Sequence, residues 1–249
     1  MDADIALDIL RRETGVLAVA ARPALRRAVP RYPGWTVADL VVHTGRIHRW
    51  VAEIVRTGAT ERIAHPDVAP PPGAAPLTAW LMAGAADLAA TLEDVAPSTR
   101  VWTFAGDGTA GFWRRRMALE TTIHRWDAQS AAGAPAPIPR EVALDGVTEA
   151  LTVYLGPRLA GAAVGGAGQR VALHCTDSHR TWSLRLLPEG VDIDDDGQAA
   201  ADVTVEGTAE DLWRYLMGRH RLDDLRVTGD RAAALLCSAA IDMVPAPQR

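Results

Sequence analysis

Residues 117–127 read Met-Ala-Leu-Glu-Thr-Thr-Ile-His-Arg-Trp-Asp, a stretch with the pattern of a helix. Glu120 and His124 are four residues apart, so on a helix their side chains leave one face and lie close enough to bind a single metal ion. His43 lies in a second stretch of helical pattern, residues 35–43, which has its own start signal. Two histidines and one glutamate would make a three-ligand site with an open coordination position, as in catalytic zinc sites.

The residues around the pair favour a metal site over a salt-bridged surface. A glutamate and a histidine at this spacing also occur on solvated helix faces, where they form ion pairs and aid solubility. Here the apolar residues Leu119, Ile123 and Trp126 flank the pair, and on a packed helix charged groups persist only when paired or metal-bound. Asp127 is placed to accept the second N–H of His124, as outer partners of metal-binding histidines do; the alternative is an ordinary surface carboxylate near a helix end.

Two histidines compete for the third ligand position. His48 follows His43 by five residues, which places it about 140° around the helix, so both cannot face one ion. Apolar Leu40 and Val41 precede His43 and predict that it points inward, although a core histidine satisfied by hydrogen bonds is the alternative. Asp39, one turn earlier, is either an outer partner of the site or a helix cap. We predict that the other four histidines are not ligands: His65, His174, His179 and His220.

Length and composition limit the class of protein. The chain has 249 residues, which allows one large domain or two small ones, and 48% of them are apolar. No apolar run approaches the roughly 20 residues of a membrane span, and the acidic N-terminus lacks the order of a secretory signal. The formal net charge is −5, with no basic block of the kind that binds nucleic acid. We therefore expect a cytoplasmic protein whose partner is a small-molecule substrate, with no nucleic-acid or membrane partner.

Two further features of composition are informative. Cys175 and Cys237 are too few and too far apart for a disulfide framework or a zinc ribbon, so we expect both to be reduced and structural. The sequence contains no lysine and no asparagine, and all 26 basic residues are arginine. This usage is typical of a very GC-rich genome, such as that of an actinobacterium. The lack of lysine excludes Schiff-base catalysis and a phosphate-binding P-loop.

The first half of the chain has the pattern of a four-helix bundle with one long crossover loop. Thr36, followed three residues later by Asp39, predicts a capping box at the start of the second helix. The proline-rich residues 65–73 predict the crossover loop. The predicted helices cover residues 2–28, 36–57, 77–95 and 111–132.

The closely spaced prolines of residues 133–139 predict a linker between a domain at 1–135 and a second at 140–249. In the second domain we expect helices at 140–155, 208–216 and 230–240, and strands at 171–175, 182–186, 202–206 and 225–227. Residues 192–197 match the opening of a calcium-binding loop, but Val203 stands where the bidentate glutamate is needed. They are interpreted as a solvated hairpin turn. The predicted fold is an all-α bundle followed by an α+β domain.

The assembled ligand set and its flanking motifs resemble those of the mycothiol-dependent maleylpyruvate isomerase family. Residues 33–43, Pro-Gly-Trp-Thr-Val-Ala-Asp-Leu-Val-Val-His, resemble the motif that ends in its first metal ligand. Residues 116–128 resemble the motif that supplies the other two. Residues 201–207, 212–219 and 227–230 resemble its second domain. The resemblance implies a DinB-like metal-binding bundle, a C-terminal sterol-carrier-like domain, and His43, Glu120 and His124 as ligands, with zinc as the expected ion.

The resemblance also implies the chemistry. Mycothiol, the small thiol of actinobacteria, would occupy the open metal position as a thiolate and add to an activated cis double bond, as in maleylpyruvate; rotation and elimination would give the trans isomer. The acidic substrate needs cationic partners. Arg116, one turn before Glu120, and Arg46, three residues after His43, are candidates, with surface charge as the alternative. Arg219 of the second domain is a further candidate catalytic residue.

Two other functions remain open at this stage, because a metal and thiol scaffold does not identify a substrate. One is a mycothiol S-transferase that conjugates an electrophile or a natural-product intermediate without returning the thiol. The other is a non-catalytic protein that binds a metal and a small ligand. Consumption of free thiol would indicate the transferase, and an intact site without thiol dependence would favour the binding protein.

Overall fold

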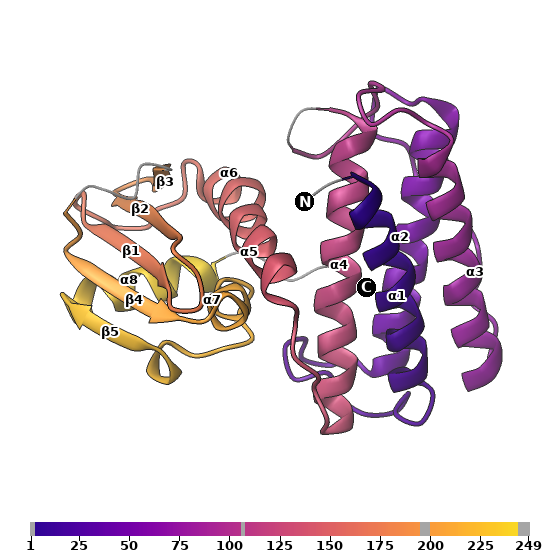
Figure 1. The fold of residues 1–249 in the computed structure, drawn as a ribbon, viewed down its shortest axis with the longest axis horizontal. Coiled ribbons are helices and arrows are strands. Elements are labelled where there is room, and N and C mark those ends of the chain that lie inside the picture. Colours follow the sequence, from indigo (N-terminus) through magenta and orange to yellow (C-terminus); the bar gives the residue numbers. More distant parts are fainter. Residues whose placement is uncertain (1–2, 106–107, 195–199, 244–249) are drawn as a thin grey trace. The chain divides into compact units, whose positions relative to one another are not determined.

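The computed structural model of the protein describes residues 3–105, 108–194 and 200–243 (Figure 1). The chain divides into two compact units, Met1–Ala136 and Pro137–Gln248. The first unit is helical and the second contains a mixed sheet with helices, which confirms the predicted fold class. The predicted linker, residues 133–139, spans the division between the units.

Four helices build the N-terminal unit: α1 (Ala3–Ala21), α2 (Val37–Thr57), α3 (Ala74–Glu93) and α4 (Ala110–Ala132). Helix α1 is shorter than the predicted 2–28. It ends before Arg22 and Pro23, because the residue that precedes a proline disfavours the helical region and the proline ring blocks the next turn.

Helix α2 has the predicted start. The Thr36 side chain accepts a hydrogen bond from the Asp39 backbone N–H, and the Asp39 carboxylate accepts one from the Thr36 N–H at 2.8 Å. Asp39 is therefore a helix cap. The helix ends at Gly58, whose φ of 60° is the left-handed conformation that glycine adopts without steric cost.

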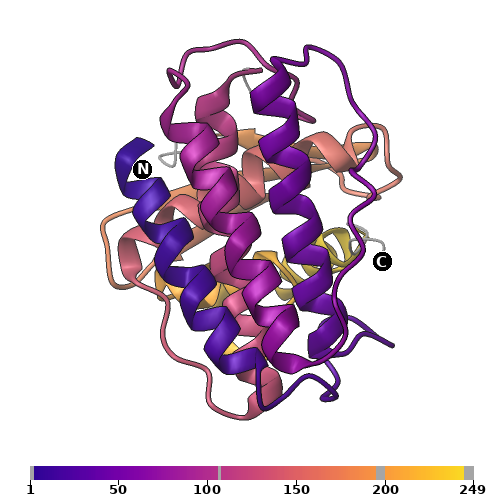
Figure 2. The same cartoon turned by 90° about the vertical axis from the view of Figure 1, so that its right-hand side faces the viewer.

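Ion pairs and ring contacts show how the four helices run. Arg56 near the end of α2 binds Asp87 in the second half of α3, so these helices are parallel. The crossover loop that connects α2 to α3 runs back along the length of the bundle (Figure 2). Helix α4 is antiparallel to α2, since Trp50 late in α2 contacts Trp113 at the start of α4. Helix α1 packs against α3 and α4.

Among the described residues of the bundle, buried apolar side chains form two separate clusters. One cluster contains Trp50, Leu88 and Met117, and the other contains Leu17, Leu40 and Leu81. Between them the same helices bury polar side chains: Glu13 and Thr14 on α1, Thr44 and His48 on α2, and Thr121, Thr122, His124 and Arg125 on α4. Burying such groups costs free energy unless each finds a partner. Apolar packing does not account for this polar layer, which makes it the candidate location of a functional site.

Helix α3 is long and apolar enough to span a membrane by composition, which the search for apolar runs in the sequence did not predict. Its buried residues, among them Leu77, Leu81, Leu88 and Leu92, belong to the two apolar clusters of the bundle. The apolar composition of α3 is thus used in the core, as in the interior helix of a bundle.

The C-terminal unit begins with α5 (Arg140–Glu149), a π-helical segment (Ala150–Leu155) and α6 (Gly156–Leu159), where the sequence predicts a single helix over 140–155. Pro157 has no N–H to continue the α-helical ladder, and its ring crowds the carbonyl four residues earlier, so the wider π turn precedes it.

The sheet has the strand order β3-β2-β1-β4-β5, with β1 and β4 parallel and the other neighbours antiparallel. Its strands are β1 (Arg170–Cys175), β2 (Thr181–Leu187), β3 (Gly190–Asp194), β4 (Val203–Gly207) and β5 (Arg226–Gly229). Helices α7 (Ala209–Leu216) and α8 (Arg231–Asp242) pack against it, with a short 3₁₀ turn at Leu222–Asp224.

One interpretation of the second half is wrong. Residues 192–194 belong to strand β3 and pair with Ser183, Leu184 and Arg185 of β2, whereas the sequence analysis assigned residues 192–197 to a turn. The aspartates hid the alternating pattern because one face of this edge strand is exposed to solvent. The rest of the assigned turn, residues 195–197, lies outside the described residues.

Candidate metal centre

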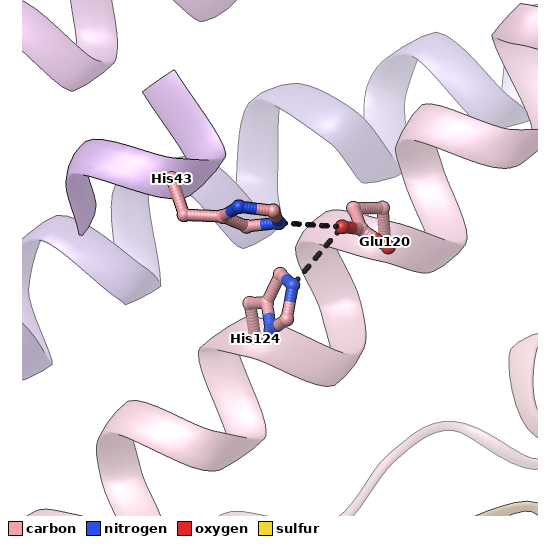
Figure 3. A group of neighbouring side chains, drawn as sticks. All are labelled: His43, Glu120 and His124. Carbon is pink, nitrogen blue, oxygen red and sulfur yellow. Dashed lines mark hydrogen bonds and ion pairs between the residues drawn. The ribbon is translucent and has the colours of Figure 1, made fainter. Parts of the chain in front are cut away.

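At the polar layer, His43 of α2 lies close to Glu120 and His124 of α4 (Figure 3). Both imidazole rings direct Nε2 at the same carboxylate oxygen, Glu120 Oε1, at 3.4 Å from His43 and 3.0 Å from His124. All three ligand atoms lie within 4.8 Å of one another. In the part of the chain that the structure describes, this is the one group of three such side chains that could hold a metal ion.

The outer nitrogen of His124 has a partner. Its Nδ1 lies 3.0 Å from Asp127 Oδ2, and the side chains of both residues are 2% exposed. A carboxylate at Nδ1 fixes the proton there and leaves the lone pair on Nε2, the atom that faces Glu120. Asp127 thus lies where an outer hydrogen-bond partner of a metal-binding histidine is found.

Arg116 lies inside this site rather than at its rim. Its side chain is 4% exposed, and its guanidinium forms an ion pair with Glu120 Oε2, the oxygen that does not face the histidines. The two residues are at positions i and i+4, about one helical turn apart on α4. Arg116 therefore orients the glutamate through Oε2 and leaves Oε1 facing the two imidazoles.

His48 is fully buried but does not join the group. Its Nε2 lies 2.9 Å from Thr121 Oγ1, while Nδ1 finds no hydrogen-bond partner among the described residues. The angular separation from His43 along α2 accounts for this, since five residues rotate the side chain away from the ligand face. His48 instead joins α2 to α4 beside the site.

Two aromatic side chains from the segment before α2 pack against the histidines on one side of the site. Trp35 contacts the His43 ring with centroids 5.3 Å apart, and Tyr32 contacts the His124 ring at 6.0 Å, both in edge-to-face geometry. Tyr32 and Trp35 are about 95% buried themselves, at 5% and 6% exposure. Tyr32 was not predicted to be part of the site, because its only signal in the sequence is its place just before the capped start of α2.

Burial keeps the imidazole of His43 neutral. The pKa of His43 is lowered to about 3, first by removal of the ring from water and then by the charges of His124 and Arg116. A neutral imidazole keeps its lone pair at physiological pH, so His43 could bind a metal without first losing a proton. Two imidazoles and one carboxylate match the donor set of an open zinc site.

The buried His48 makes the metal-free protein acid-sensitive. Burial, with smaller contributions from Arg49, His124 and His43, lowers its pKa to about 3, against about 6.5 in the unfolded chain. The stability from burying it neutral is fully present above pH 6.5 and is lost as the pH falls toward 3, by about 1.4 kcal/mol for each pH unit. We expect His48→Gln to lose less stability than the wild type between pH 6.5 and 5 in urea titrations of metal-free protein. Parallel pH dependences would contradict this account.

Comparison with family models decides the affiliation of the chain. Residues 6–129 match the mycothiol maleylpyruvate isomerase N-terminal domain, and residues 141–236 match the C-terminal domain of the same family. The chain belongs to the mycothiol-dependent maleylpyruvate isomerase family. Both motifs that carry the predicted ligands, residues 33–43 and 116–128, lie inside the first matched segment.

Solved structures share the fold of this family member. The crystal structure of the mycothiol-dependent maleylpyruvate isomerase matches with a TM-score of 0.63 and 17% identity, over 92% of this chain and 93% of that one. A histidine-to-alanine mutant of that enzyme matches with a TM-score of 0.64, the same identity and the same coverage. A comparison with curated proteins gives no match.

The other residues singled out from the sequence lie outside the group of His43, Glu120 and His124. Arg219 follows α7 in the C-terminal unit and donates a hydrogen bond from Nη1 to the Met217 carbonyl at 2.6 Å, and its catalytic role stays a prediction. Arg46 is exposed on α2. Cys175 and Cys237 are buried and form no disulfide within the described residues. Of the histidines predicted not to be ligands, none belongs to the metal group: His65, His174, His179 and His220.

Proposed function

We propose that the protein is a metal-dependent enzyme that uses mycothiol to isomerise an activated cis double bond, with maleylpyruvate as the model substrate. The observation that carries the proposal is the group of His43, Glu120 and His124, whose ligand atoms lie within 4.8 Å of one another. The donor set fits a divalent ion, with zinc as the expected one. When bound, the ion and the mycothiol sulfur supply a thiolate at neutral pH, whose reversible addition to the alkene permits rotation to the trans isomer.

The residues of the chain have separate tasks in this proposal. His43, His124 and Glu120 Oε1 would hold the ion, and a site with three protein ligands leaves a position for the thiol. Asp127 fixes the tautomer of His124, and Arg116 holds the second oxygen of Glu120. The reaction returns both the thiol and the proton, so it needs no oxidant or reductant.

The walls of the site support thiol chemistry in a water-poor environment. The buried rings of Tyr32 and Trp35 cover the histidines on one side, and the ligand side chains are 2% to 12% exposed. Excluding water strengthens the electrostatic interactions of the ligands and limits competition of hydroxide for the open position. Small residual exposure of His43 and Glu120 indicates the side from which thiol and substrate approach.

The test follows conversion of maleylpyruvate by the purified, metal-loaded protein with and without added mycothiol, together with a titration of free thiol. We expect isomerisation only with mycothiol, with the free thiol concentration unchanged at completion. Loss of one thiol for each substrate consumed would replace the isomerase by an S-transferase. Metal binding without any thiol-dependent conversion would favour a binding protein. Glutathione in place of mycothiol is the control for a nonspecific thiol effect.

A further inference from the structure

A group of basic side chains lies along α2 beyond the metal centre. Arg46 and Trp50 follow His43 by three and seven residues, so all three share one face of the helix. At 1.5 Å of rise per residue, Arg46 lies about 4.5 Å and Trp50 about 10.5 Å farther along the helix axis than His43. The exposed side of this face therefore leads away from the metal ligands over the length of a small organic acid.

The crossover loop is fixed onto this face. The His65 ring stacks on the Trp50 ring with centroids 4.4 Å apart and an interplanar angle of 12°. The Trp50 Nε1–H donates a hydrogen bond to the Ile63 carbonyl at 3.0 Å, and the Arg62 guanidinium lies 5.7 Å from the Trp50 ring centroid. Trp50 itself is 6% exposed, so it is a rigid floor under the two basic side chains of the loop.

The basic groups are close enough to act on one another. The pKa of His65 is lowered, first by partial burial and then by the charges of Arg62, His43 and Arg46. The imidazole of His65 thus lies within electrostatic range of both arginines and of a metal ligand. We call Arg46, Arg62 and His65 the arginine shelf.

Among the described residues, the two arginines of the shelf have no acidic partner. Both are exposed, and neither forms an ion pair or a hydrogen bond with the residues that the structure describes. Arg56, on the same helix, binds both Glu53 and Asp87. Arg46 and Arg62 both act electrostatically on His65 and carry like charge, so an anion bound near His65 would reduce a repulsion that the free protein carries. Guanidinium groups pair with planar carboxylates through two parallel hydrogen bonds.

We propose that the arginine shelf binds a carboxylate of the substrate and so places its reactive carbons at the metal centre. The proposal rests on the proposed function. It assigns the substrate to the class of small carboxylic acids whose activated double bond lies a few bonds from the carboxylate. Arg62 and Arg46 supply the charge, and the neutral His65 supplies an N–H donor. The Trp50 ring fixes the loop residues in position, so little side-chain freedom is lost on binding.

The test measures binding rather than turnover. Calorimetry follows maleate, a cis dicarboxylate, binding to the purified metal-loaded protein and to Arg46→Gln, Arg62→Gln and the double variant. We expect each single substitution to weaken binding about tenfold and the double about a hundredfold. Arg56→Gln is the matched control, with the same change of charge on the same helix, and should stay within about twofold. Metal content, measured on every variant, should be unchanged.

Two outcomes would overturn the arginine shelf. One is a double variant that binds maleate as tightly as the wild type. The other is a wild-type protein that binds uncharged dimethyl maleate as tightly as the dianion. Neither outcome would affect the proposed function, which depends on metal content and on the need for mycothiol.

Discussion

We expect the wild-type protein to purify with about one divalent ion per chain and the His124→Ala variant to purify without it. The substitution removes the Nε2 that faces Glu120 Oε1 and leaves two of the three ligand side chains. Loss of an outer partner of a ligand already costs roughly 10- to 100-fold in metal affinity, and loss of the ligand itself costs more. Elemental analysis after dialysis against metal-free buffer gives the stoichiometry.

Two further variants make this result specific. His124→Ala also leaves the buried Asp127 without its imidazole, so a lost fold must be distinguished from a lost ligand. His43→Ala makes that distinction, because the side chain of His43 makes its polar contact with Glu120 alone among the described residues, and its removal leaves Asp127 paired with His124. His179→Ala, an exposed histidine of the C-terminal unit, is the control and should keep the ion. A full complement of metal in folded His43→Ala or His124→Ala would refute the centre and the proposed function with it.

Local sequence signals predicted the parts of the centre that lie within one or two helical turns. The spacing of Glu120 and His124 follows from helix geometry, and so does the contact between His124 and Asp127. The capping box at Thr36 fixes where α2 begins and thereby the face on which His43 lies. Exclusion of His48 needed only the rotation per residue.

The parts that were missed depend on contacts between distant segments. Nothing near Tyr32 in the sequence indicates that its ring meets His124, since that contact depends on how the connection before α2 folds back. The stack of His65 on Trp50 joins the crossover loop to a helix. Arg116 was predicted as a candidate partner of the substrate because it lies one turn before Glu120. The same i, i+4 spacing also allows the ion pair with Glu120 that the structure contains. Helix spacing gives proximity, but tertiary packing decides which partner a charge takes.

The ion pair between Glu13 and Arg125 is another such long-range contact, and its loss should be costly. Arg125 donates from Nε to Glu13 Oε2 at 2.7 Å, and the two side chains are 3% and 5% exposed. Its Nη1 also binds Gln129 Oε1 and the Ala136 carbonyl. We expect Arg125→Met to lower the free energy of unfolding by about 3–5 kcal/mol, because it leaves a buried carboxylate without its main partner.

Urea denaturation followed by tryptophan fluorescence tests this expectation against a control on the same carboxylate. Arg12 also binds Glu13, but its side chain is 54% exposed, so Arg12→Met should cost at most about 1 kcal/mol. The double variant Glu13→Gln/Arg125→Met removes the buried carboxylate charge and should recover part of the loss, which identifies that charge as the cause. Equal losses for Arg12→Met and Arg125→Met would mean that burial does not set the strength of this pair. The polar layer would then tolerate unpaired charge, and the ordered surroundings of the metal ligands would need another source of rigidity.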